Sequence, residues 1–106
     1  MPDIFIDKKS LAEIRSIIKR LYPKAVVWAY GSRVGLGGDS KNAHDGSDLD
    51  LTVKDFGQKE YDISKLKEAF KESNIPFLID ISDFNQLPVS FQQEIEKKYY
   101  AVYDKT

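Results

Sequence analysis

The sequence predicts an α/β (α+β) protein in which helices cover a small mixed β-sheet. Short apolar runs rich in Val, Ile and Leu alternate along the chain with longer segments whose apolar residues recur at helical spacing. Gly, Asn, Asp and Pro separate these segments, as turn residues do. The segments follow in the order α-β-β-α-β-α-β, which is typical of a mixed sheet covered by helices.

The first helix is expected to begin after Asp7, because Asp is a favoured N-cap residue. Its apolar positions recur at helical spacing, charged residues cover the other side, and Pro23 follows its end. Residues 25–30 contain few polar positions. They are therefore expected to form a central strand of the sheet, with Trp28 in the core.

The later elements follow from the same two periodicities. In residues 48–54, apolar and polar side chains alternate over the first half, as they do in a strand with one buried face. Asn74 ends a second amphipathic segment, and Pro76 precedes the next apolar run. We expect strands at 48–54, 77–82 and 101–103, helices at 60–73 and 89–98, and strand packing for Tyr99, Tyr100 and Tyr103.

Composition limits the classes of function that are open to the chain. Its 106 residues are expected to form one domain, 1–106. The net charge of −1 gives no support for a nucleic-acid surface or for binding to an anionic membrane. The absence of cysteine excludes disulfides and Cys-ligated zinc. No apolar run approaches the ~20 residues of a membrane-spanning helix, and no signal-peptide pattern opens the chain, so we expect a cytoplasmic protein.

Asp48 and Asp50 are the most informative pair of residues. They stand two positions apart where a strand is expected to begin, so their side chains share one face while Leu49 and Leu51 share the other. Two like charges on one face repel each other unless a cation lies between them, and carboxylate oxygens at this spacing suit Mg²⁺ or Mn²⁺. An isolated Asp-x-Asp, in contrast, is usually a pair of solvated carboxylates.

Two further segments strengthen the case for a site. The strand at 25–30 leads into Gly31-Ser32, a position where backbone N–H groups can hold a phosphate, although an isolated Gly-Ser is usually only a turn. Asp80 lies inside an apolar run, on the opposite face from Ile79 and Ile81. A charge there is costly unless it is paired or metal-bound, or unless the strand is an edge strand that turns Asp80 toward water.

The stretches Gly31-Ser32-Arg33, Ser47-Asp48-Leu49-Asp50-Leu51 and Leu78-Ile79-Asp80-Ile81 together resemble the minimal nucleotidyltransferase (MNT) family of the DNA polymerase β-type superfamily. The resemblance covers nearly the whole chain and implies the polymerase β-type nucleotidyltransferase fold. Residues 33–47 form a longer connection than the family usually has. Within it, Gly35 to Gly46 is expected to be mobile without ligand and to become partly ordered over the triphosphate when nucleotide binds.

The resemblance also implies a reaction and a role for each residue. Two Mg²⁺ ions, or Mn²⁺ in their place, about 3.5–4 Å apart would be bound by Asp48, Asp50 and Asp80, and Asp80 would also accept a proton. Gly31 and Ser32 would hold the phosphates of ATP where a following helix starts. Arg33 would neutralise phosphate charge, or else pair with Asp48 or with a surface carboxylate.

In this family the usual partner is a small helical protein of the HEPN type. The resemblance therefore implies transfer of AMP from ATP to a hydroxyl group of a HEPN toxin, with this chain as the antitoxin. One alternative is a non-catalytic binding module that neutralises the HEPN partner by stoichiometric contact. Another is an enzyme that modifies a small molecule, which usually requires an additional substrate domain. The sequence leaves open the acceptor, the base preference, and whether the chain forms a homodimer or a hetero-oligomer.

Overall fold

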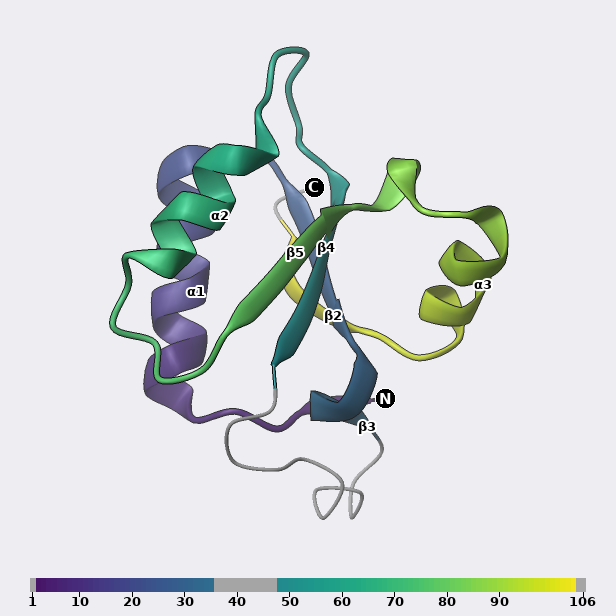
Figure 1. Ribbon diagram of the computed structural model, residues 1–106, viewed down its shortest axis with the longest axis horizontal. Helices are drawn as coiled ribbons and strands as arrows, with labels where there is room; N and C mark the ends of the chain where they lie inside the picture. Colours follow the sequence, from purple (N-terminus) through teal and green to yellow (C-terminus); the bar gives the residue numbers. More distant parts are fainter. Residues whose placement is uncertain (1, 36–47, 105–106) are drawn as a thin grey trace.

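The computed structural model describes residues 2–35 and 48–104, and within them it confirms the predicted mixed α+β class (Figure 1). The loop predicted at 35–46 lies, beyond Gly35, outside the described residues. The elements are β1 (Asp3–Ile4), α1 (Lys8–Leu21), β2 (Val26–Tyr30), the 3₁₀ turn η1 (Gly31–Arg33), β3 (Val34–Gly35), β4 (Leu49–Asp55), α2 (Ile63–Lys71), β5 (Ile79–Asp83), the 3₁₀ turn η3 (Phe84–Gln86), α3 (Val89–Lys97) and β6 (Tyr100–Asp104).

The main sheet has four strands in the order β5-β4-β2-β6. Strand β2 is an inner strand, as its apolar sequence predicts, and runs antiparallel to both of its neighbours. Strands β4 and β5 are parallel, and Asp50 lies directly opposite Asp80 in their register. A second sheet pairs β1 with β3. The sequence does not predict this pair, because strands of two residues are too short to show a periodicity.

Side-chain caps fix where the helices begin. Asp7 caps α1 as predicted, and its carboxylate accepts a hydrogen bond from the backbone N–H of Ser10 at 3.0 Å. Helix α2 is shorter than the expected 60–73, because Asp62 caps it by accepting from the N–H of Ser64 at 2.9 Å. Among the described helices, none combines the length and the apolar character that a membrane crossing requires.

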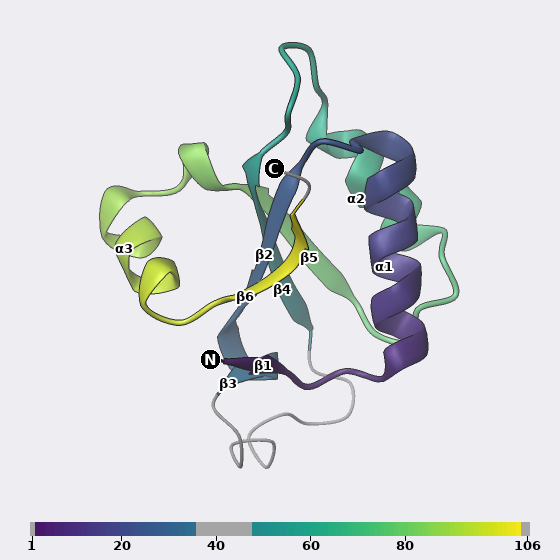
Figure 2. The same ribbon diagram turned by 180° about the vertical axis from the view of Figure 1, so that it is seen from behind.

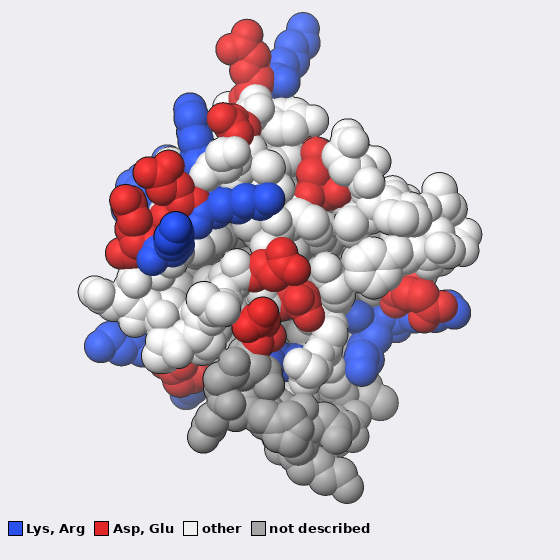
Figure 3. Space-filling view, in the orientation of Figure 1, with Lys and Arg blue, Asp and Glu red and all other residues white. Residues whose placement is uncertain are grey.

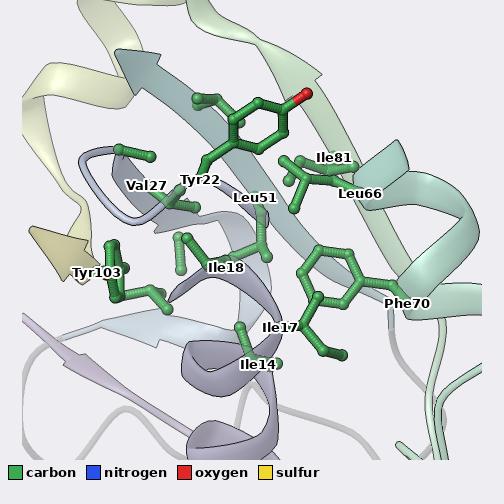
Figure 4. Close-up of a cluster of buried hydrophobic side chains, with 14 of the residues drawn as sticks. Ile14, Ile17, Ile18, Tyr22, Val27, Leu51, Leu66, Phe70, Ile81 and Tyr103 are labelled. Carbon is green, nitrogen blue, oxygen red and sulfur yellow. The ribbon is translucent and has the colours of Figure 1, made fainter. Parts of the chain in front are cut away.

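Helices α1 and α2 cover one face of the main sheet and bury the main core between helices and strands (Figures 1 and 2). Figure 4 shows apolar side chains from both helices meeting those of the main sheet, including Tyr103 of β6. The buried residues in this view include Ile14, Ile17, Ile18, Leu66, Phe70, Val27, Leu51 and Ile81. The predicted amphipathic stripe of each helix is thus the stripe that is buried.

Helix α3 lies on the other side of the sheet, together with a cluster of aromatic side chains. The rings of Trp28 and Tyr99 stack with centroids 3.9 Å apart, and Phe84 meets Trp28 edge-on at 5.6 Å. Lys54 lies 4.3 Å from the centre of the Phe84 ring. Trp28, expected in the core, is therefore only half-buried, in this second cluster rather than in the main one.

The main core predicts the outcome of a matched pair of leucine substitutions. Leu51→Ala should lower the free energy of unfolding by about 2–5 kcal/mol, because Leu51 is fully buried and its loss leaves a cavity. Leu78→Ala should change it by less than about 0.5 kcal/mol, because Leu78 is 72% exposed. Urea denaturation of both variants measures the difference, and equal effects would contradict this assignment of the core.

Candidate active site

The three carboxylates singled out in the sequence come from two neighbouring strands. Asp50 on β4 lies opposite Asp80 on β5, and Asp48 immediately precedes β4. Asp50 is half-buried, whereas Asp48 and Asp80 are exposed. Leu49 and Leu51 are fully buried, so they point into the core while Asp50 points away from it. Figure 3 shows acidic side chains gathered at the centre of this view of the molecule, over β4 and β5.

The surroundings of Asp50 disfavour the negative charge of its carboxylate. Partial burial raises the pKa of its carboxyl above the ordinary value, and the nearby charges of Asp80 and Asp48 raise that pKa further. All three causes penalise the ionised form of Asp50. A cation bound between the carboxylates would remove the repulsion and favour the ionised form, so the charge pattern suits a positively charged ligand.

Tyr30 is a member of the site that the sequence analysis missed. It ends β2 directly opposite Asp50. Burial raises the pKa of the Tyr30 hydroxyl, and the charges of Asp50 and Asp80 raise that pKa further, which places the phenol beside both carboxylates. The position of Tyr30 just before Gly31 could have indicated it as a site residue. Its closeness to Asp50, however, depends on the pairing of β2 with β4, which the sequence alone does not show.

Hydroxyl groups tie β4 to β5 next to the carboxylates. Thr52 is fully buried and faces Ser82 in the parallel register, one same-face position beyond Asp50 and Asp80. The Thr52 hydroxyl donates to the carbonyl oxygen of Ser82 at 3.3 Å, and the Ser82 hydroxyl donates to the Thr52 hydroxyl at 3.2 Å. These bonds add to the backbone ladder that keeps the two carboxylates side by side.

Gly31 brings a backbone turn against Asp50. Its φ is +85°, a conformation that favours glycine, and a Cβ atom at this position would collide with Oδ2 of Asp50. The turn is stabilised by a hydrogen bond from the N–H of Val34 to the carbonyl of Gly31. Ser32 is exposed beside it. Gly31-Ser32 and the carboxylates therefore meet at one place on the sheet.

The segment after Gly31 differs from the prediction. A helix was expected to start there, but the structure has a single 3₁₀ turn that leads into the two-residue strand β3. Pairing of β3 with β1 holds the backbone extended, so no helix continues from the turn. Any phosphate held here would meet the N–H groups of a turn rather than those of a helix.

Arg33 lies behind the turn instead of on its surface. The side chain is buried, and Nη1 donates a hydrogen bond to the carbonyl oxygen of Phe5 at 3.1 Å. The guanidinium also lies over the ring of Phe77, 4.5 Å from its centre. Arg33 thus links the turn to the N-terminal segment and to the approach of β5. Its contact with phosphate stays a prediction.

The donor set suits a hard divalent cation. Carboxylate oxygens are the ligands that Mg²⁺ prefers, and Asp50 and Asp80 face each other with one of them partly desolvated. Within residues 2–35 and 48–104, however, no three His, Cys, Asp or Glu side chains are arranged as a group that could hold a metal ion.

Two comparisons relate the chain to known proteins, while no protein-family model matches it. It is 35% identical over 103 residues to the protein named "Probable protein adenylyltransferase MntA" of Haemophilus influenzae, covering 94% of this chain and 84% of that protein. Its fold is similar to a crystal structure described as a toxin-antitoxin with AMP-PNP. The TM-score is 0.58 at 15% identity, covering 95% of this chain and 76% of that one.

The close approach of Gly31 to Asp50 predicts that a larger residue at position 31 disturbs the site. Gly31→Ala should destabilise the fold by roughly 1–2 kcal/mol, because alanine is strained at positive φ. It should also weaken binding of Mn²⁺–ATP, measured by calorimetry, because the new methyl group displaces Asp50. Gly57→Ala is the matched control: Gly57 also has positive φ, at +76°, but its Cβ would meet the backbone of Lys24 instead. Equal loss of binding in both variants would contradict the prediction.

The raised pKa of Asp50 predicts a pH-dependent gain in stability for Asp50→Asn. The folded protein holds this proton more tightly than the unfolded chain, so wild-type stability falls as the pH rises through the folded-state pKa. Without divalent ions, the variant should be more stable than wild type at neutral pH. The gain should vanish below pH 3.8, the ordinary value for this carboxyl, where both states are protonated. Urea denaturation across this range measures it, with Asp3→Asn, an exposed residue, as control.

Proposed function

Because the chain belongs to the minimal nucleotidyltransferase family, with an MntA protein adenylyltransferase as its relative, we propose that it transfers AMP from ATP to a protein hydroxyl group in a Mg²⁺-dependent reaction. The acceptor we propose is a HEPN-type helical toxin, which the modification silences. The observation that carries this proposal is the meeting of Asp50, Asp80 and the Gly31 turn at one place on the sheet.

The roles proposed for the chain's residues are those that the family resemblance implies, and their positions are compatible with them. The exposed turn at Gly31-Ser32 offers backbone N–H groups and a hydroxyl to the β- and γ-phosphates of ATP. Asp48, Asp50 and Asp80 would hold Mg²⁺. When bound, the metal neutralises phosphate charge and lowers the pKa of the attacking hydroxyl. Asp50 itself is half-buried, so its carboxylate is partly shielded from water.

The proposed reaction is a single displacement at the α-phosphorus of ATP. A bond forms from the acceptor oxygen to this phosphorus, and the bond to pyrophosphate breaks. The acceptor proton passes to Asp80, which is exposed on the outermost strand and can be reached by a second protein. Asp50, opposite it and partly desolvated, would stay with the metal.

The choice of a toxin as acceptor is supported by the names of the two similar proteins. One is a probable protein adenylyltransferase, and the other belongs to a toxin-antitoxin crystallised with a non-hydrolysable ATP analogue. The first name fits a chain that transfers AMP to a protein, and the second fits a chain that binds a nucleotide and pairs with a toxin. The HEPN class of that toxin rests on the resemblance of the Gly31-Ser32 and Asp48-x-Asp50 motifs to the minimal nucleotidyltransferases.

An adenylylation assay tests the proposal. Wild-type protein, incubated with labelled ATP, Mg²⁺ and a HEPN-type partner, should add the mass of AMP to the partner, and removal of Mg²⁺ with EDTA should stop the reaction. Asp50→Asn and Asp80→Asn should each reduce transfer by at least roughly 10²-fold while partner binding persists. Asp3→Asn should transfer normally. If Asp80→Asn silences the toxin as well as wild type does, with no AMP on the partner, inhibition is by contact alone.

A further inference from the structure

Exposed apolar side chains flank the carboxylates. Among the described residues, four large hydrophobic side chains are exposed: Tyr61, Leu78, Val89 and Phe91. Leu78 lies two positions before Asp80 and outside the core cluster, so it shares the face of the carboxylate. Phe91 projects from α3, and its ring meets that of Tyr30 edge-on, with centroids 5.6 Å apart. Single exposed hydrophobics are ordinary, but these two lie beside the reacting groups.

Leu78 and Phe91 lie beside the two end members of a row that contains the carboxylates, with Leu78 two residues before Asp80 and Phe91 against Tyr30. Tyr30, Asp50 and Asp80 form one row across β2, β4 and β5, with Phe91 beyond the Tyr30 end. Two strand spacings, roughly 10 Å, separate the backbones of Tyr30 and Asp80 at the ends of this row. Figure 3 shows uncharged side chains to the left and right of the central acidic group.

The separation between β2 and β5 limits which ligand could contact both Leu78 and Phe91. A purine ring could pack against Phe91 or against Leu78, but it is too small to contact both across the carboxylates. A protein that presents a hydroxyl side chain to Asp80 must cover the carboxylates, and its surface then extends over both sides of them. The exposed position of Asp80 on the outermost strand leaves this approach open.

We propose that Leu78 and Phe91 form an apolar rim that seats the acceptor protein over the carboxylates, so that its hydroxyl side chain enters between them. This inference rests on the proposed function, because it takes the acceptor to be a protein. The rim would bury apolar area around a polar centre, which is the usual anatomy of a protein interface. Leu78 and Phe91 would act in binding and orientation and would take no part in the chemical step.

Separate binding and kinetic measurements test the rim. Leu78→Ala and Phe91→Ala should each weaken binding of the HEPN-type partner about tenfold, measured by calorimetry without nucleotide. In the transfer assay they should raise KM for the partner, with little change in kcat or in the Kd for ATP. Tyr61→Ala is the matched control: Tyr61 is 50% exposed, stacks on Phe56, and is remote from the carboxylates. It should bind the partner normally.

The outcomes distinguish this inference from the proposed function. If both rim variants bind the partner as tightly as wild type, or if they weaken ATP binding instead, the rim is overturned, whether or not wild type transfers AMP. If wild type binds the partner through the rim but transfers no AMP, the rim stands and the proposed function fails. If wild type binds no HEPN-type partner, both fail. A double variant that loses binding more than either single one supports a shared surface.

Discussion

The parallel pairing of β4 with β5 places two carboxylates side by side on one sheet face, and the candidate site depends on this pairing. The register that sets Asp50 opposite Asp80 also sets Leu51 opposite Ile81, and these two residues are buried in the core under α1 and α2. A shift by one residue would expose the leucine and bury the charge. Packing of the core therefore holds Asp50 and Asp80 close together, although the repulsion between their charges favours a larger separation.

The turn after β2 is held against this pair from both sides. In front, Gly31 can approach Oδ2 of Asp50 only because it has no Cβ. Behind it, buried Arg33 joins the turn to Phe5 and to the ring of Phe77. The short β1–β3 sheet continues the same connection through the N-terminal segment. The position of the turn thus depends on residues far from it in sequence, and Arg33 contributes to the site by fixing its backbone.

The sequence predicted what local periodicity controls. Helical spacing and the Asp7 cap defined α1, and alternation in β4 separated Asp50 from Leu49 and Leu51. It could not predict what strand pairing controls. Tyr30 joins the site only because β2 runs beside β4, and the 3₁₀ turn replaces the expected helix because β3 pairs with β1. The burial of Arg33 likewise depends on two phenylalanines distant in sequence, Phe5 and Phe77, while its expected contact with phosphate stays a prediction.

One face of the main sheet forms the hydrophobic core, and the other face carries the candidate site. Helices α1 and α2 bury one face, and that burial can sustain the unfavourable charge of Asp50 on the other. On the second face, α3 reaches β2 through Phe91 and Tyr30, while Asp80 on β5 remains exposed. A further helix packed over this face of β5 would add apolar burial but would cover Asp80, which is exposed in the described structure. The exposed face of β5 is therefore the feature on which the proposed approach of an acceptor protein depends.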